Sequence, residues 1–171
     1  MGRKLALVVL TFVAGTPLAA QQGNEGGGIA AARKLFQQTA ATYVRFAEAM
    51  PEEHYGFKPT PEVRSYGQIL GHVANENYLF CASALGEPDP NRADFEKTTS
   101  KAELITALKA AFGYCEKAYA LPESRAGEQA TLFGNTGSRV WVLMYNVLHD
   151  GEHYGNLVTY LRLKGLVPPT T

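Results

Sequence analysis

The chain has 171 residues, of which 46% are hydrophobic, and this length fits one domain that buries a core of its own. Its 16 basic residues balance its 16 acidic residues, so the formal charge at neutral pH is zero. Because no basic stripe or block occurs, the composition argues against a nucleic acid as the main partner.

The first twenty residues have the pattern of an export signal. Two basic residues precede a short apolar run at residues 5–14, and small residues end the segment. The run is shorter than the roughly 20 residues that a membrane-spanning helix needs. We therefore predict a signal peptide at 1–20, a flexible glycine-rich lead-in at 21–28, and a periplasmic or secreted domain at 29–171 that has no stable membrane span.

Four segments show apolar residues at the three- and four-residue spacing that is typical of amphipathic helices. They cover about residues 29–50, 65–85, 100–121 and 138–164, and polar connections with glycine or proline separate them. No segment has a convincing alternating pattern for a strand. Four long helices around one core predict an all-α fold, a four-helix bundle.

The connections indicate how the helices are joined. Gly86 and Pro88 end the second helix in the order expected at a C-terminus. Ser100 and Glu103 form a capping-box pattern at the start of the third helix. Between them, residues 86–99 make a connection longer than a tight helix hairpin needs. We therefore expect a long crossover between helices 2 and 3, which are then not simple antiparallel neighbours.

The last helix is apolar over most of its first half. Residues 140–148 are apolar on most sides, which predicts that this part of the helix is buried. Gly151 and Gly155 follow on one face, and each costs roughly 1 kcal/mol relative to alanine. They either let another helix pack closely or leave room beside the histidines of the same helix.

Cys81 and Cys115 are the only cysteines. In an oxidising compartment a disulfide between them would close a loop of about 35 residues and stabilise the fold by roughly 4 kcal/mol. Alternatively, both are small buried hydrophobic residues on different helices. The sequence leaves these two interpretations open, because pairing requires Cα atoms within roughly 7 Å.

Three of the four histidines form the most informative pattern. His149 and His153 are four residues apart in the last helix and share a face, while His72 lies near the middle of the second helix. Two imidazoles from one helix and a third from another can meet at one divalent ion. Three protein ligands with an open fourth position are typical of catalytic rather than structural zinc. We predict a metal site here; the alternative is that each is a hydrogen-bonded core histidine.

The histidine pair also matches a zinc-peptidase pattern. Residues 149–153 read H-D-G-E-H, which fits H-x-x-E-H but not H-E-x-x-H. Such peptidases take their third ligand from a downstream glutamate, and no aspartate or glutamate follows Glu152. We interpret the match as chance.

Four further residues are candidates for the site. Glu76, one turn after His72, is a candidate acceptor for a ligand N–H or a general base, with a salt bridge as the alternative role. Asn75, Tyr145 and Asn156 lie within about a turn of a predicted ligand and either line the same cavity or simply pack.

These segments resemble the DinB-like (DinB/YfiT) family of small metal-binding four-helix bundles. The similarity is carried by YGFKPTPEVRSYGQIL at residues 55–70, by GHVANENYLFC at residues 71–81, and by LHDGEHYGNLVTYLRLKGLVPP at residues 148–169. An early histidine and a late H-x-x-x-H pair, followed by Gly-Asn and by Gly-Leu-x-Pro-Pro, make the combination fairly specific.

The resemblance implies more than the spacing does. It implies an up-down-down-up bundle, and one divalent ion, commonly zinc, nickel or iron, on His72, His149 and His153. It also implies a homodimer. Characterised members of the family include transferases and isomerases that depend on low-molecular-weight thiols, in which the metal activates the thiolate.

Two hypotheses for function follow. In the first, the exported protein is a metal-dependent transferase or hydrolase that activates a thiol or water toward a small electrophile. In the second, the protein is not a catalyst; the metal stabilises the bundle, and a small ligand or a partner binds to it. The sequence does not decide between an enzyme and a binding protein.

Overall fold

The structure is a computed structural model that describes residues 26–170. The predicted signal peptide at 1–20 and most of the lead-in at 21–28 lie outside the described residues. Nine elements follow one another along the chain: α1 Gly28–Ala49, η1 Glu52–His54, α2 Tyr66–Leu85, η2 Phe95–Lys97, α3 Lys101–Tyr119, η3 Glu123–Arg125, β1 Gln129–Leu132, β2 Asn135–Ser138 and α4 Arg139–Leu163.

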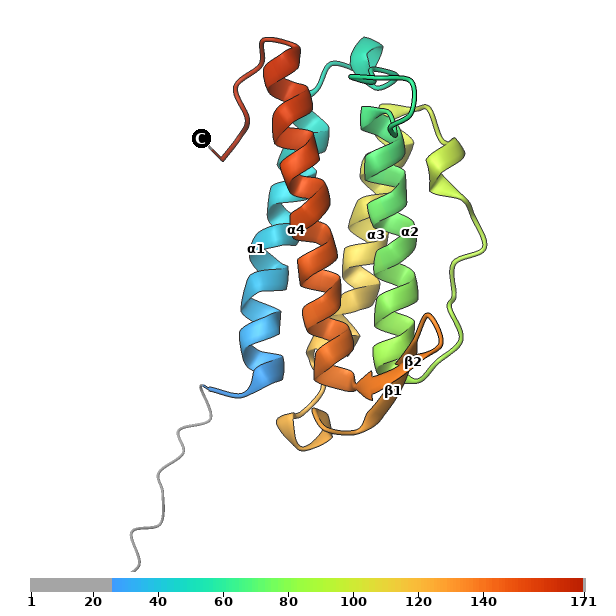
Figure 1. Cartoon of the computed structure of the whole chain (residues 1–171), viewed down its shortest axis with the longest axis vertical. Helices are drawn as coiled ribbons and strands as arrows, with labels where there is room; N and C mark the ends of the chain where they lie inside the picture. Colours follow the sequence, from blue (N-terminus) through green and yellow to red (C-terminus); the bar gives the residue numbers. More distant parts are fainter. Residues whose placement is uncertain (1–25, 171) are drawn as a thin grey trace, which may run out of the picture.

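The four long helices form a bundle in which α1 and α4 run one way and α2 and α3 run the other (Figure 1). The segment between α2 and α3 crosses the full height of the bundle and packs η2 against α2. Helix α1 packs mainly against α3 and α4, and α2 packs against the same two helices. The prediction of an all-α, up-down-down-up bundle with a long crossover between helices 2 and 3 is therefore confirmed.

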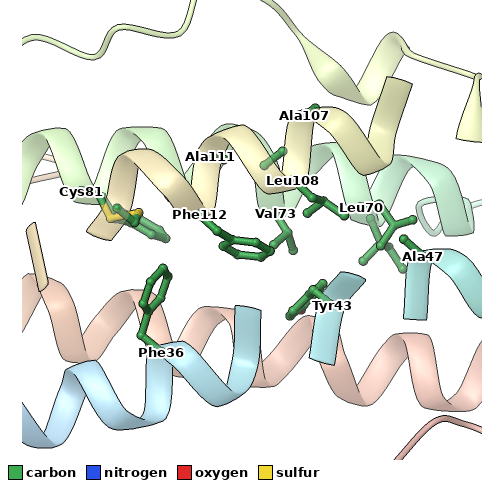
Figure 2. Packing of buried hydrophobic residues seen from close by; sticks show 14 of the residues in the cluster. Phe36, Tyr43, Ala47, Leu70, Val73, Cys81, Ala107, Leu108, Ala111 and Phe112 are labelled. Carbon is green, nitrogen blue, oxygen red and sulfur yellow. A yellow bond between two sulfur atoms is a disulfide. The ribbon is translucent and has the colours of Figure 1, made fainter. Parts of the chain in front are cut away.

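Aromatic side chains fill the centre of the bundle (Figure 2). Phe36 stacks on Tyr119 with ring centroids 4.1 Å apart and meets Phe112 edge-on at 5.9 Å. The buried hydroxyl groups of Tyr43 and Tyr119 donate to backbone carbonyls of α4 at 2.6 and 3.0 Å. Each such ring contributes apolar burial of about 1.5–3 kcal/mol, and its hydroxyl is satisfied as well.

The two cysteines form a disulfide between α2 and α3, which is visible in the core in Figure 2. The Cα atoms of Cys81 and Cys115 are 5.2 Å apart, well inside the range that a disulfide requires. Helices α2 and α3 lie side by side and run in the same direction, so residues at matching heights meet. The structure thus decides between the two interpretations that the sequence left open.

Helix ends agree closely with the predicted signals. The side chain of Ser100 accepts a hydrogen bond from the backbone N–H of Glu103 at 3.4 Å, and Gly86 ends α2 in the left-handed conformation with φ of 76°. Ser65 and Gln68 form a full reciprocal capping box at the start of α2, which the sequence analysis did not single out.

The expectation that no strand is present was wrong for residues 129–138. Strands β1 and β2 form an antiparallel hairpin, with Leu132 opposite Asn135. The two turn residues, Phe133 and Gly134, have φ of 50° and 77°, the left-handed pair that a tight hairpin turn requires. The usual Asn-Gly signal is absent because phenylalanine occupies the first position, and four-residue strands are too short to show a pattern.

The prediction that the first half of α4 is buried was also wrong. Met144 is 44% exposed and Leu148 is 69% exposed. Helix α4 packs against α1 and α2 and also contacts strands β1 and β2, and its remaining face points outward. Gly151 and Gly155 lie on this outer face, where an added Cβ would meet nothing within 4 Å. They therefore neither admit a close helix nor make room for a histidine.

Within the described residues, no helix has the length and apolarity that crossing a bilayer requires.

Candidate metal site between α2 and α4

The structure brings the three predicted histidines together. Each offers one ring nitrogen to a group whose members all lie within 4.8 Å of one another. The Nε2 atoms of His72 and His149 are 3.1 Å apart, and the ring of His153 lies 4.6 Å from that of His149, between centroids. Three imidazoles from two helices thus face a common point.

Neighbouring residues explain why the imidazoles have this placement. His72 is followed on α2 by Val73 and Ala74, both fully buried, and His149 is followed on α4 by the fully buried Asp150. The histidines therefore occupy the margin of the α2–α4 interface. The side chains of His72 and His149 are 12% and 14% exposed, which is enough for access but too little for full hydration.

The surroundings of His72 and His153 favour their neutral imidazoles. Burial, together with the neighbouring His149 and His72 rings, lowers the pKa of His153 from 6.5 to about 4. Burial, followed by the Arg64 charge, also lowers the pKa of His72. A neutral imidazole keeps a lone pair for a metal ion, so the lowered pKa values of His72 and His153 favour the protonation state that ligation requires.

Glu96, on the crossover, is a carboxylate that contacts His72. Its Oε1 lies 2.8 Å from Nδ1 of His72, and its Oε2 accepts from Nε of Arg64 at 3.0 Å. Glu96 was not among the predicted site residues, because helical spacing relates a histidine only to acceptors within about a turn on the same helix. No spacing signal links residues 24 positions apart when a crossover joins them.

Glu76, the predicted acceptor or general base, has a different environment. Its Oε2 is buried and has no hydrogen-bond partner among the described residues. Burial raises the pKa of Glu76, while the nearby His149 acts in the opposite direction. Among residues 26–170, Glu76 neither accepts a hydrogen bond from a predicted histidine ligand nor forms the salt bridge that was the alternative. Its role as a general base stays a prediction.

A cavity of about 560 Å³ opens beside the histidines. Polar side chains dominate its wall, which is made by Lys58, Glu62, Val63, Arg64, Gln68, Ile69, Glu96, Glu152, His153, Asn156 and Tyr160. The volume suits a small molecule, and His153 and Glu96 connect the cavity to the histidine group.

The three predicted cavity residues are placed in three different ways. Asn156 lines the cavity, and its side-chain amide is 3.4 Å from Nδ1 of His153. Asn75 faces the crossover instead and hydrogen-bonds Asp94 at 3.2 Å. Tyr145 packs edge-on against Phe80, with ring centroids 5.6 Å apart. Of the three, only Asn156 lines this cavity.

Comparison with known proteins agrees with the fold. The family model of the DinB superfamily matches residues 35–157, a range that contains all three histidines. The uncharacterized protein YjoA of Bacillus subtilis (strain 168) is 25% identical over 126 residues, which cover 70% of this chain and 79% of that protein. A DinB-like protein from Bacillus cereus ATCC 10987 superposes with a TM-score of 0.69 at 15% identity, over 78% of this chain and 93% of that one.

Proposed function

This chain belongs to the DinB superfamily, and we propose that it binds one divalent metal ion through His72, His149 and His153. The observation that carries the proposal is the convergence of three ring nitrogens within 4.8 Å. Neutral imidazoles suit zinc, nickel and iron, the three ions that the sequence resemblance implies. Three protein ligands leave room for a further ligand.

The ring nitrogens of His72 and His149 already have the spacing that such an ion requires. The 3.1 Å between Nε2 of His72 and Nε2 of His149 is within the span of two ligands that each lie about 2.0–2.1 Å from one centre. Without an ion, two neutral imidazoles aimed at each other form a hydrogen bond only if one carries a proton on Nε2. The buried Nδ1 of His149 makes no hydrogen bond within the described residues. The protein therefore leaves one ring nitrogen of the histidine group without a hydrogen-bond partner.

We further propose that the protein is a transferase or hydrolase that acts on a small electrophile. A bound divalent ion supplies a lowered pKa for a coordinated water or thiol. The cavity beside His153 would hold the electrophile, with Arg64 and Lys58 supplying positive charge at its wall and Asn156 supplying an amide. Glu76, half-buried near His149 with a raised pKa, is the candidate to hold a proton during the reaction.

Metal binding is tested on the purified protein by elemental analysis and by thermal melting with and without a chelator. We expect about one equivalent of a divalent ion and a lower melting temperature after its removal. His149→Ala should abolish both the bound ion and the chelator effect. His54→Ala, which alters the one histidine outside the cluster, is the matched control and should retain both. Equal metal content in the two variants would overturn the proposal.

Catalysis is tested separately, with small electrophiles offered to the metal-loaded protein in the presence and absence of low-molecular-weight thiols. Turnover that disappears in His149→Ala supports the enzyme. A metal-stabilised protein that gives no turnover with any of them supports the alternative, a non-catalytic binder of a small ligand or partner. Turnover that survives loss of the metal would reject the mechanism.

We also propose that the mature protein is periplasmic or secreted and forms a homodimer. The signal-like residues 1–20 and the Cys81–Cys115 disulfide support export, because disulfides persist in oxidising compartments. The exposed apolar side chains of Met144 and Leu148 on α4 support association. Cell fractionation with intact-mass measurement tests the first proposal, and light scattering tests the second.

A further inference from the structure

The crossover between α2 and α3 places one carboxylate directly against a predicted metal ligand. We infer that Glu96 is a positioning residue for the metal site: it holds His72 in the tautomer and orientation that direct Nε2 to the ion. The inference rests on the proposed metal binding, and it assigns a function to a segment that otherwise only connects two helices.

The fold delivers Glu96 through a close backbone approach. A Cβ at Gly71, the residue before His72, would collide with the backbone at Phe95 and Glu96. Only a residue without a side chain lets the crossover lie flat against α2 at this height. The backbone of Glu96 therefore lies against Gly71, next to His72 in the chain. The Glu96 side chain then has only a short distance to span to reach the imidazole of His72.

Hydrogen bonds from Asn75 and Asp94 hold the crossover in place around Glu96. The side-chain oxygen of Asn75 accepts from the backbone N–H of Phe95 at 3.2 Å, and its amide donates to Asp94 at 3.2 Å. Asp94 in turn accepts from the backbone N–H of Glu96 at 3.2 Å. These hydrogen bonds fix the backbone at Phe95 and Glu96. The position of the Glu96 carboxylate therefore depends on this small network as well as on its own side-chain rotamer.

Each carboxylate oxygen of Glu96 has a hydrogen-bond partner. Oε2 accepts from Nε of Arg64 at 3.0 Å, and Oε1 lies 2.8 Å from Nδ1 of His72. An ionised carboxylate only accepts hydrogen bonds, so Nδ1 of His72 must carry the proton. The lone pair then resides on Nε2, the nitrogen that lies 3.1 Å from Nε2 of His149. A carboxylate in this position orients a ligand and makes it more basic.

Arg64 links this arrangement to the cavity. Its Nε donates to Glu96, and the guanidinium lies in the cavity wall together with Glu96 and His153. Glu62 lies in the same wall and has no described contact with any of the three histidines. It therefore supplies a matched carboxylate whose removal changes the charge of the cavity but leaves the support of His72 intact.

The test compares Glu96→Ala, Glu96→Gln and Glu62→Gln for zinc affinity, by competition with a chromophoric chelator. Glu96→Ala should weaken binding about 10- to 100-fold. Glu96→Gln, whose amide oxygen still accepts from Nδ1, should recover part of that loss, and Glu62→Gln should stay within about twofold of the parent protein. If Glu96→Ala binds zinc as the parent does while His149→Ala does not, the inference is overturned.

A second readout needs no metal. Nitrogen-15 chemical shifts of the metal-free protein report which ring nitrogen of His72 carries the proton. We expect Nδ1–H in the parent protein and a mixture of tautomers in Glu96→Ala, with circular dichroism confirming that the variant is folded. An Nε2–H tautomer in the parent would overturn the inference. Failure of the parent to bind any metal would instead overturn the proposed function, so the two failures are distinguishable.

Discussion

Two polar clusters share the interface between α2 and α4, and they are built in opposite ways. The histidine cluster, His72, His149 and His153, borders a cavity, and its rings are partly accessible. The amide cluster, Asn77, Asn146 and Asp150, is completely buried. His149 and Asp150 are adjacent in the chain, yet each belongs to a different cluster, since consecutive helical residues point about 100° apart.

Hydrogen bonds between protein groups link the three members of the amide cluster, while Oδ1 of Asn146 and Oδ2 of Asp150 have no hydrogen-bond partner among the described residues. Asn77 donates to Asp150 at 3.0 Å, and Asn146 donates to Asn77 and to the hydroxyl of Tyr119, both at 3.1 Å. Burial raises the pKa of Asp150, and the contacts with His149 and Asn77 act against that rise. The histidine cluster, in contrast, aims its nitrogens at one another and at the cavity side. The amide cluster is thus a hydrogen-bonded network sealed in the core, and the histidine cluster borders a cavity that a ligand can enter.

The largest expected effect on stability lies beside the amide cluster. The disulfide is within 3.7 Å of Asn146, measured from Cys81 Sγ to the amide nitrogen. Replacing both Cys81 and Cys115 with alanine should lower the free energy of unfolding by about 4 kcal/mol, because the unfolded chain regains the entropy of a loop spanning 34 positions. Urea unfolding measures this change. A loss below about 1 kcal/mol would contradict it, and zinc affinity at the histidine cluster should stay unchanged.

The histidine cluster should control the acid sensitivity of the metal-free protein. The pKa of His153 is about 4 in the folded state and 6.5 in the unfolded chain. Between these values the unfolded chain binds more protons, so the free energy of unfolding falls as the pH is lowered from about 6.5 to about 4. The contribution of His153 is about 3 kcal/mol.

Comparing parent and His153→Asn isolates this contribution. Chemical denaturation at pH 7.5 and pH 4.5 should show a smaller loss of stability in the variant, since asparagine does not titrate. The raised pKa of Asp150 has the opposite sign and is common to both proteins. An equal loss in the two proteins would mean that His153 is not held neutral by its surroundings.

Removing one member of the amide cluster should separate stability from metal binding. Asn77→Ala leaves Asp150 and the amide of Asn146 with one partner fewer. The expected cost is about 2 kcal/mol, the usual penalty for buried polar groups that lose a partner. Thermal and urea unfolding measure it. Zinc affinity within about twofold of the parent would confirm that the two clusters work independently, and a large fall in affinity would contradict it.

The smallest effect is expected on the outer face of α4. Gly151→Ala should raise the free energy of unfolding by up to about 1 kcal/mol, because alanine favours a helix and an added Cβ meets nothing within 4 Å.

Gly71→Ala, on α2, is the contrasting change, since its Cβ would collide with the crossover backbone. It should be destabilising and should also weaken zinc binding. Both changes are measured by unfolding; destabilisation by Gly151→Ala would indicate a contact on that face.

Local sequence determined the helices, their caps and the candidate ligands. The spacing of apolar residues predicted four helices, because the 3.6-residue period acts within each segment. Ser100 and Gly86 marked helix ends through bonds to backbone groups a few residues away. The four-residue spacing of His149 and His153 likewise ensured a shared face before any partner helix was known.

Tertiary structure alone decided which of these features meet. The disulfide depends on how two parallel helices are set in height, the exposure of Leu148 depends on how many neighbours α4 has, and Glu96 reaches His72 only because a crossover packs against Gly71. Such contacts join residues that are far apart in the chain and carry no periodic signal. A linear pattern specifies the direction of a side chain around its own helix; the arrangement of neighbouring segments determines what that side chain contacts.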